Sequence, residues 1–331
     1  MIRLSIRFAG ALALAAMLMP VTQAAAQQDV PAAPAAQAPS APAPAAAPVF
    51  PKPDPANFTA ASPTKETVNA FIHASWGYDE TRVWEVWAIQ KTEVDGISRV
   101  TLLVGDKSGK QKIITAQFFA LPDGKHIFAG DDIVPFGADP FAEARAVAQQ
   151  RADGPYRGSA SKDLELVEFA AFQCPYCKAA QANMEKLAVD FPKARIVFQN
   201  SPLPKEKHPA DAVAAAYGVC VSKQGGSGAF FTFAAAVFEG QDGLASADGA
   251  TLTLNSAVTK AGLDPVAIAA CAKTPATIAA VDASAKLSQD LKIAQTPTLL
   301  INGRQVTASA PYDILKQIIL FQAKLDNVAA Q

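Results

Sequence analysis

Two cysteines separated by two residues, Cys174 and Cys177, are the side chains best suited to chemistry in this sequence. This spacing lets one sulfur attack a disulfide as a thiolate and lets the second sulfur resolve the mixed disulfide that forms. It also fits half of a zinc site or a short structural disulfide. The other cysteines, Cys220 and Cys271, lie far apart, and the three histidines show no paired metal spacing, so no metal is expected. A disulfide closing so short a loop would add little stability.

A strand and a helix flank the dithiol. Residues 164–169 (LELVEF) form an apolar segment of strand type, and after Cys174 apolar residues recur at steps of three and four as far as Phe191. The dithiol therefore lies at a helix N-terminus, where unpaired N–H groups and the helix dipole favour a thiolate. Pro175 suits the first helical turn. We predict that Cys174 is the attacking sulfur, exposed to solvent and with a lowered pKa, and that Cys177 resolves the mixed disulfide.

Two segments carry a family resemblance. Residues 167–177 read VEFAAFQCPYC and residues 293–303 read IAQTPTLLING. Together they resemble the bacterial DsbA-like branch of the thioredoxin superfamily, over roughly residues 160–328. The resemblance implies an α/β class, a thioredoxin fold with a helical insertion, and the activity of a protein thiol-disulfide oxidoreductase or isomerase without a cofactor.

The resemblance also implies roles for residues around the dithiol. Pro297 matches the family's cis-proline, and the backbone of Thr296 before it would pair with an extended substrate. Glu168 matches a buried acid that exchanges protons with Cys177, although a surface glutamate at the strand end is an alternative. Substrate contacts are expected at Pro175, Tyr176 and Thr296.

A helical insert is expected at about residues 205–292, within a thioredoxin-like domain of residues 160–331. Its helical segments are expected at residues 211–222, 229–238, 254–261, 265–271 and 277–291. Cys220 and Cys271 are candidates for a structural disulfide in this insert, and two isolated core thiols are the alternative.

The sequence before residue 160 indicates an exported protein with a second domain. Residues 1–26 have the basic, apolar and small-residue parts of a cleaved signal peptide, and their apolar run is too short for a membrane anchor. A Pro/Ala-rich linker is expected at residues 27–63. A small α+β domain is expected at residues 64–140, and a connector helix and linker at residues 141–159. In the α+β domain we expect antiparallel strands at residues 83–94, 97–105 and 112–121, with a fourth at 125–129.

Charge and domain order limit the partners. The net charge of −1 gives no concentrated basic face, so nucleic acid is not expected. We expect a periplasmic protein that acts on exported proteins carrying thiols or disulfides and is reset by a membrane redox partner. The domain order resembles the dimeric DsbC and DsbG isomerases, which suggests a homodimer through residues 64–140. The sequence leaves oxidase, isomerase and reductase directions open. A non-catalytic holdase chaperone and a periplasmic thiol reductase are the alternatives.

Overall fold

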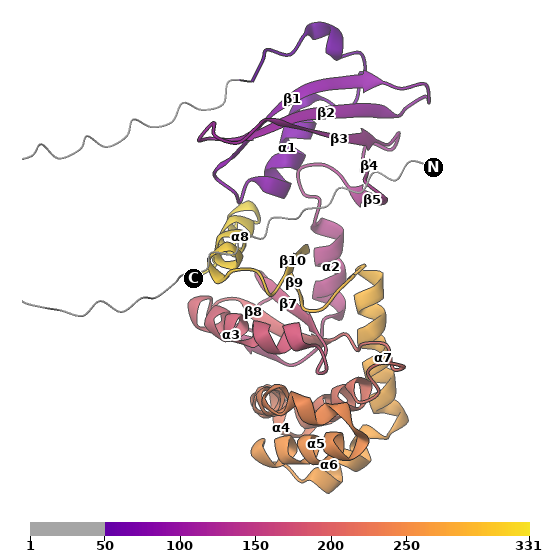
Figure 1. The fold of residues 1–331 in the computed structure, drawn as a ribbon, viewed down its shortest axis with the longest axis vertical. Coiled ribbons are helices and arrows are strands. Elements are labelled where there is room, and N and C mark those ends of the chain that lie inside the picture. Colours follow the sequence, from indigo (N-terminus) through magenta and orange to yellow (C-terminus); the bar gives the residue numbers. More distant parts are fainter. Residues whose placement is uncertain (1–49) are drawn as a thin grey trace, which may run out of the picture. The chain divides into compact units, whose positions relative to one another are not determined.

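The computed structural model describes residues 50–331. The predicted signal peptide and most of the predicted linker lie outside the described residues. The described chain contains two five-stranded sheets, one before and one after the connector helix (Figure 1). The predicted α/β class with a preceding antiparallel sheet is confirmed.

The first sheet is antiparallel throughout, in the order β1-β2-β3-β4-β5. It is preceded by a short 3-10 helix, η1 (Pro55–Asn57), and by helix α1 (Lys65–Trp76). The strands are β1 (Arg82–Lys91), β2 (Ser98–Asp106), β3 (Ile114–Ala120), β4 (His126–Ala129) and β5 (Asp132–Pro135). Strand β5 was not predicted, because its four residues carry too short a pattern to be recognised from the sequence.

The core of this domain lies between the sheet and α1. Val68 and Ile72 of α1 are buried with apolar residues of β1, β2 and β3. The pairing of β1 with β2 shifts between Val86 and Ala88, which makes Trp87 the extra residue of a β-bulge. The bulge explains why Val86 and Ile89 are both buried although they are three positions apart.

The boundary predicted for the linker is wrong at its C-terminal end. Phe58 forms a bridge with Ile89 of β1, and Phe58 and Ala60 pack against the core of the first domain. The Pro/Ala-rich composition before residue 55 led to the prediction that the linker continues to residue 63. The folded domain therefore begins before residue 64.

The second sheet has the order β10-β9-β7-β8-β6. The connector helix α2 (Ala142–Arg151) comes first, within the segment where a connector helix was predicted. The remaining elements of this layer are β6 (Tyr156–Gly158), β7 (Glu165–Ala170), α3 (Pro175–Asp190), β8 (Arg195–Asn200), β9 (Thr298–Ile301), β10 (Arg304–Thr307) and α8 (Tyr312–Leu325). Strand β6 lies in the segment predicted to be a linker.

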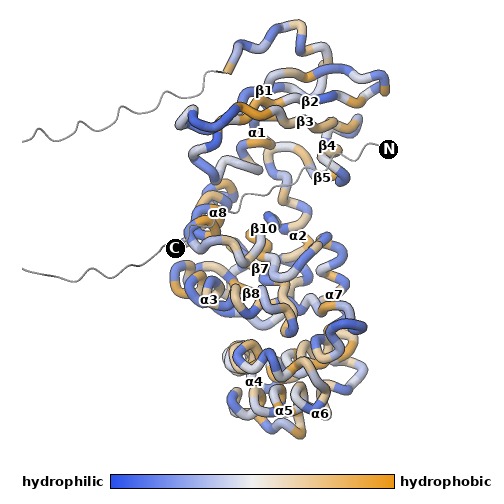
Figure 2. Tube along the Cα trace, in the orientation of Figure 1, coloured by the Kyte–Doolittle hydropathy of each residue, from blue (hydrophilic) through white to orange (hydrophobic). Residues whose placement is uncertain are grey.

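Helices cover both faces of this sheet, so β7, β8 and β9 are buried throughout. One apolar cluster joins the sheet to α3 and α8, and another joins it to α2 and α7 (Pro275–Asp290). Strands β7 and β8 are parallel, and β9 and β10 run antiparallel. Figure 2 shows hydrophobic stretches in the strands, whereas the turn between β2 and β3 is hydrophilic.

The insert between β8 and β9 is helical, as predicted. It contains α4 (Asp211–Glu239), the 3-10 helix η2 (Gln241–Ala245), α5 (Ala247–Lys260), α6 (Pro265–Ala272) and α7. Gly226 has a φ of 73° and kinks α4, which divides it into the two segments predicted from the sequence. Helix α5 begins at Ala247, earlier than the predicted residue 254, because the side chain of Ser246 caps its N-terminus.

A buried arginine joins the two domains. Arg304 of β10 is 5% exposed, and its guanidinium donates to the carbonyl oxygens of Ala74 and Ser75 at the end of α1, the latter at 2.9 Å. It also lies over the ring of Phe141, 4.2 Å from the ring centroid. Carbonyl oxygens at a helix C-terminus lack helical partners, so a cation satisfies them well.

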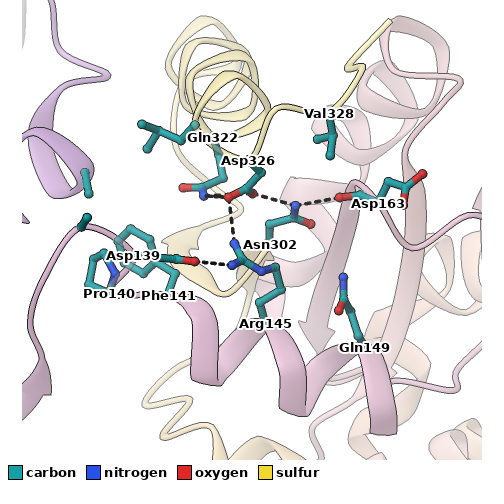
Figure 3. Close-up of a pocket in the computed structure, with 13 residues that line it drawn as sticks. Asp139, Pro140, Phe141, Arg145, Gln149, Asp163, Asn302, Gln322, Asp326 and Val328 are labelled. Carbon is teal, nitrogen blue, oxygen red and sulfur yellow. Dashed lines mark hydrogen bonds and ion pairs between the residues drawn. The ribbon is translucent and has the colours of Figure 1, made fainter. Parts of the chain in front are cut away.

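A polar network lines a cavity of about 440 Å³ near this junction (Figure 3). Arg145 of α2 binds Asp326 at 2.8 Å and also pairs with Asp139. Asn302 donates to Asp326 at 2.8 Å and to the carbonyl oxygen of Asp163 at 2.8 Å. The cavity is lined by no cysteine, and Arg145, Asn302 and Gln322 all bind the carboxylate of Asp326.

None of the helices within residues 50–331 is by itself long and apolar enough to cross a membrane. Helices α6 and α7 reach that length and composition only as a pair, bent by 68°.

Candidate active site

Cys174 occupies the N-cap position of α3, directly after a loop that leaves the end of β7. Pro175 is the first helical residue, where its missing N–H removes no hydrogen bond. The predicted solvent exposure of Cys174 is wrong, because packing at the helix start leaves it 5% exposed, whereas the neighbouring Tyr176 is 69% exposed. Cys174 and Cys177 are both free thiols. The structure thus brings the two sequence-predicted sulfurs together at the helix start.

The surroundings of Cys174 lower the pKa of its thiol to about 5. The largest cause is a hydrogen bond from the side chain of Cys177. The side chain of Thr296 and the backbone N–H groups of Cys177 and Tyr176 also stabilise the thiolate, whereas burial opposes it. Several hydrogen-bond donors therefore surround Sγ of Cys174, as expected for the sulfur that is predicted to be a thiolate.

Cys177 is fully buried and its pKa is shifted in the opposite direction. The hydrogen bond to Cys174 is the largest cause of the raised pKa, followed by burial. The backbone N–H of Ala171 lies 3.5 Å from its Sγ. At neutral pH this arrangement holds one sulfur as a thiolate and the other as a thiol.

The loop before β9 lies beside the nucleophile. The Thr296-Pro297 peptide bond is cis, and Sγ of Cys174 lies 3.4 Å from the carbonyl oxygen of Thr296. The two segments that carry the family resemblance therefore meet in the structure, although 122 positions separate these two residues.

Glu168 lies on β7 beneath the dithiol and is 2% exposed, which excludes a surface position for it. Burial raises the pKa of its carboxyl group to about 7. The charge of Arg157 and a hydrogen bond from Gln181 to Oε1 at 3.0 Å counteract this shift. Its charge in turn contributes to the raised pKa of Cys177. A carboxyl group that titrates near neutral pH can take up or release a proton there.

Sequence reasoning missed Arg157, Gln181, Asp211 and Gln241. Arg157 belongs to the unpredicted strand β6, and pairing through β8 places it on the same sheet face as Glu168. Gln181 lies one helical turn after Cys177, a spacing that could have indicated it. Asp211 and Gln241 contact the dithiol loop from the insert, and nothing in their local sequence indicates that contact.

The remaining two cysteines lie away from this site. Cys220 of α4 and Cys271 of α6 form a disulfide with a Cα–Cα distance of 6.0 Å. Among residues 50–331, no three His, Cys, Asp or Glu side chains are grouped so that they could hold a metal ion.

A comparison with protein families matches residues 150–320 to the family described as Thioredoxin. This segment covers more than half of the chain and contains both the dithiol and Pro297. The chain belongs to the thioredoxin family.

Solved structures also match part of the chain. A thioredoxin-like oxidoreductase from Silicibacter pomeroyi DSS-3 is 24% identical, with a TM-score of 0.47, and the match covers 54% of this chain and 98% of that one. A periplasmic thioredoxin-like protein from Salmonella enterica serovar Typhimurium is 20% identical, with a TM-score of 0.46, covering 55% and 96%. The thiol-disulfide exchange protein alpha-DsbA2 from Wolbachia pipientis is 21% identical, with a TM-score of 0.46, covering 56% and 96%.

One curated protein also matches. The Na(+)/H(+) antiporter NhaA 3 of Salinispora tropica is 34% identical over 92 residues, which are 28% of this chain. The chain spans only 14% of the length of that protein.

Proposed function

We propose that this protein is a periplasmic thiol-disulfide oxidoreductase that forms or isomerises disulfides in exported proteins through Cys174 and Cys177. The observation that carries the proposal is the position of Cys174 at the start of α3, 3.4 Å from the carbonyl oxygen of Thr296 in the cis-proline loop. The surroundings lower the pKa of Cys174 to about 5 and raise that of Cys177. A thiolate attacks disulfides, and a stable thiolate is also a good leaving group. One sulfur thus serves both directions of exchange.

In the oxidising direction, a substrate thiolate attacks Sγ of Cys174 and the Cys174–Cys177 bond breaks. Cys177 leaves as a thiolate and takes a proton, for which Glu168 is the nearby donor. A second substrate thiolate then attacks the substrate sulfur of the mixed disulfide and releases the thiolate of Cys174. Two electrons pass from the substrate dithiol to the protein, and a disulfide-bearing membrane partner accepts them in the next cycle.

In the isomerising direction, the thiolate of Cys174 attacks an incorrect substrate disulfide and releases one substrate thiolate. That thiolate attacks another substrate disulfide, and the exchange ends when a substrate sulfur displaces Cys174. No net electrons are transferred. The carbonyl oxygen of Thr296 lies beside Cys174, where it can accept a hydrogen bond from the backbone of an extended substrate.

The experiment is a refolding assay with two substrates, one fully reduced and one with scrambled disulfides, followed by recovery of their activity. The wild type should accelerate recovery of at least one substrate, and Cys174→Ser should abolish the effect. If Cys174→Ser acts as well as the wild type on both substrates, the protein is a holdase chaperone. An equilibrium reduction potential of about −120 mV supports an oxidant, and one of about −270 mV supports a thiol reductase.

A homodimer through the first domain is part of the proposal. Phe128 and Ile133 are paired across β4 and β5 on the face of the sheet away from α1, and they are 42% and 51% exposed, a surface that a second copy could cover. Sedimentation of the chain from residue 27 over a range of concentrations tests it. A monomer at every concentration would remove the dimer.

A further inference from the structure

The helical insert contacts the dithiol loop at two separate points. Asp211, the first residue of α4, is 1% exposed. Its Oδ1 accepts a hydrogen bond from the backbone N–H of Gln173 at 2.9 Å, and its Oδ2 accepts one from the backbone N–H of Leu203 at 2.7 Å. The residue directly before the nucleophile is thus fixed by a carboxylate from the insert.

The second contact comes from η2. The side-chain amide of Gln241 donates to the carbonyl oxygen of Phe172 at 2.7 Å and to that of Cys174 itself at 3.0 Å. In the reverse direction, the side chain of Gln173 donates to the carbonyl oxygen of Leu244 in η2 at 3.0 Å. Backbone groups on both sides of the loop are therefore held by side chains far away in the sequence.

These contacts bear on the position of the thiolate. Two of the donors that stabilise it are the backbone N–H groups of Tyr176 and Cys177, and the direction of such bonds depends on the path of the chain through residues 172–174. A short loop without these contacts could relax and move Sγ away from the helix start. The insert is therefore placed to fix the geometry on which the reactivity of Cys174 depends.

We propose that Asp211 and Gln241 are positioning residues through which the helical insert sets the acidity and the reduction potential of Cys174. This inference rests on the proposed function, because it concerns the same dithiol. It assigns to the insert a role in setting the reactivity of Cys174, in addition to packing beside the dithiol.

Because Asp211 is negatively charged, a charge effect and a positioning effect would change the pKa of Cys174 in opposite directions. If Asp211 acted only through its negative charge, Asp211→Asn would remove a repulsion and lower the pKa of Cys174. If it positions the loop, the same substitution leaves one backbone N–H without an acceptor and raises that pKa. Gln241→Met removes the other contact without a change of charge and should act in the same direction as Asp211→Asn.

The test measures the pKa of Cys174 from thiolate absorbance, and the equilibrium with glutathione, in the full-length mature protein. We expect Asp211→Asn and Gln241→Met each to raise the pKa by about one unit. Each should change the equilibrium constant about tenfold towards the oxidised form, or about 30 mV to more negative potential. Two matched controls should leave both quantities unchanged. Asp106→Asn alters a carboxylate that accepts from two backbone N–H groups in the first domain, and Gln317→Met alters an amide that donates to the carbonyl oxygen of Tyr78.

The outcomes separate the two proposals. A wild-type pKa near about 8.5 for Cys174 would contradict the proposed function itself. A wild-type pKa near 5 that neither substitution changes would overturn only the role of the insert. Far-ultraviolet circular dichroism identifies a variant that fails to fold, and the remaining variant then decides.

Discussion

The side-chain amide of Gln181 donates a hydrogen bond to Oε1 of Glu168 at 3.0 Å, beneath the buried sulfur of Cys177. A single hydrogen bond and the charge of Arg157 do not offset the burial of this carboxyl group, so its pKa stays raised, at about 7. The dithiol therefore has a titratable neighbour whose protonation changes within the physiological range.

The first prediction follows from that pKa. The folded protein keeps the Glu168 proton up to about pH 7, whereas the unfolded chain releases it near pH 4.5. The free energy of unfolding should therefore fall as the pH rises through this interval, by a component that Glu168→Gln lacks. Urea unfolding of the oxidised wild type and variant between pH 4.5 and pH 8 measures it, and parallel curves would contradict the raised pKa.

Arg157 provides a second variant for the same carboxyl group. Its charge lowers the pKa of Glu168, so Arg157→Met should raise that pKa further and move the pH-dependent interval upwards. The buried Nε of Arg157 has no hydrogen-bond partner, and its guanidinium lies 4.4 Å from the ring centroid of Phe231, so Met removes the charge and keeps an apolar contact there. If the free energy of unfolding of this variant falls over the same pH interval as in the wild type, the charge of Arg157 does not affect the pKa of Glu168.

The second prediction concerns the nucleophile. The alkylation rate of the reduced protein should follow the thiolate fraction of Cys174, with a midpoint near pH 5. Cys177→Ala should move the midpoint upwards by the largest amount of any single substitution, because the Cys177 side chain is the largest cause of the lowered pKa. Cys177→Ser keeps a hydroxyl donor and should retain part of the shift. A wild-type midpoint near about pH 8.5 would contradict the site geometry.

How much of this site the sequence predicts depends on how local each contact is. The position of Cys174 at a helix start follows from a strand, a proline and an apolar periodicity, all within about one helix length of the dithiol. Glu168 and Pro297 required the family resemblance, because their distance from the sulfurs is set by the fold. Gln241 could not be predicted, since its partner Cys174 is 67 positions away.

The fold shows the same limit. Long strands such as β1 and β2 have clear patterns, but β5 and β6 are so short that only their neighbours make them strands. The contacts of Phe58 were hidden in a segment whose composition indicates a linker. Such elements form because they pair with residues far away in the sequence, and their local β-propensity is not sufficient to predict them.

The third prediction concerns the disulfide of the insert. Cys220 and Cys271 are 51 positions apart, and closing a loop of that length removes chain entropy from the unfolded state. Replacing both by Ala should lower the free energy of unfolding by about 4 kcal/mol. Urea unfolding measures this loss, with Cys174 and Cys177 retained. Disulfide exchange by the folded variant should persist, and its loss would show that the insert disulfide takes part in the reaction.

The fourth prediction concerns Arg304. Arg304→Ala leaves the carbonyl oxygens of Ala74 and Ser75 without their donor and should cost about 3 kcal/mol. Arg304→Lys keeps the charge but cannot reach several acceptors at once, so it should restore only part of the stability. Thermal unfolding measures both. As a control, the exposed Arg99, which lies over the ring of Phe119, should change stability by no more than about 0.5 kcal/mol when replaced by Ala.

The burial of Cys220 limits how the disulfide of the insert can exchange with other thiols. Its sulfur is bonded to Cys271, the residue is 0% exposed, and the hydroxyl group of Thr277 lies 3.4 Å from the sulfur. The sulfur of Cys220 is therefore closed to external thiols, whereas its partner Cys271 is only partly buried. Exchange of this bond with an external thiol must therefore begin at Cys271, which slows the loss of the insert's cross-link during turnover of the dithiol.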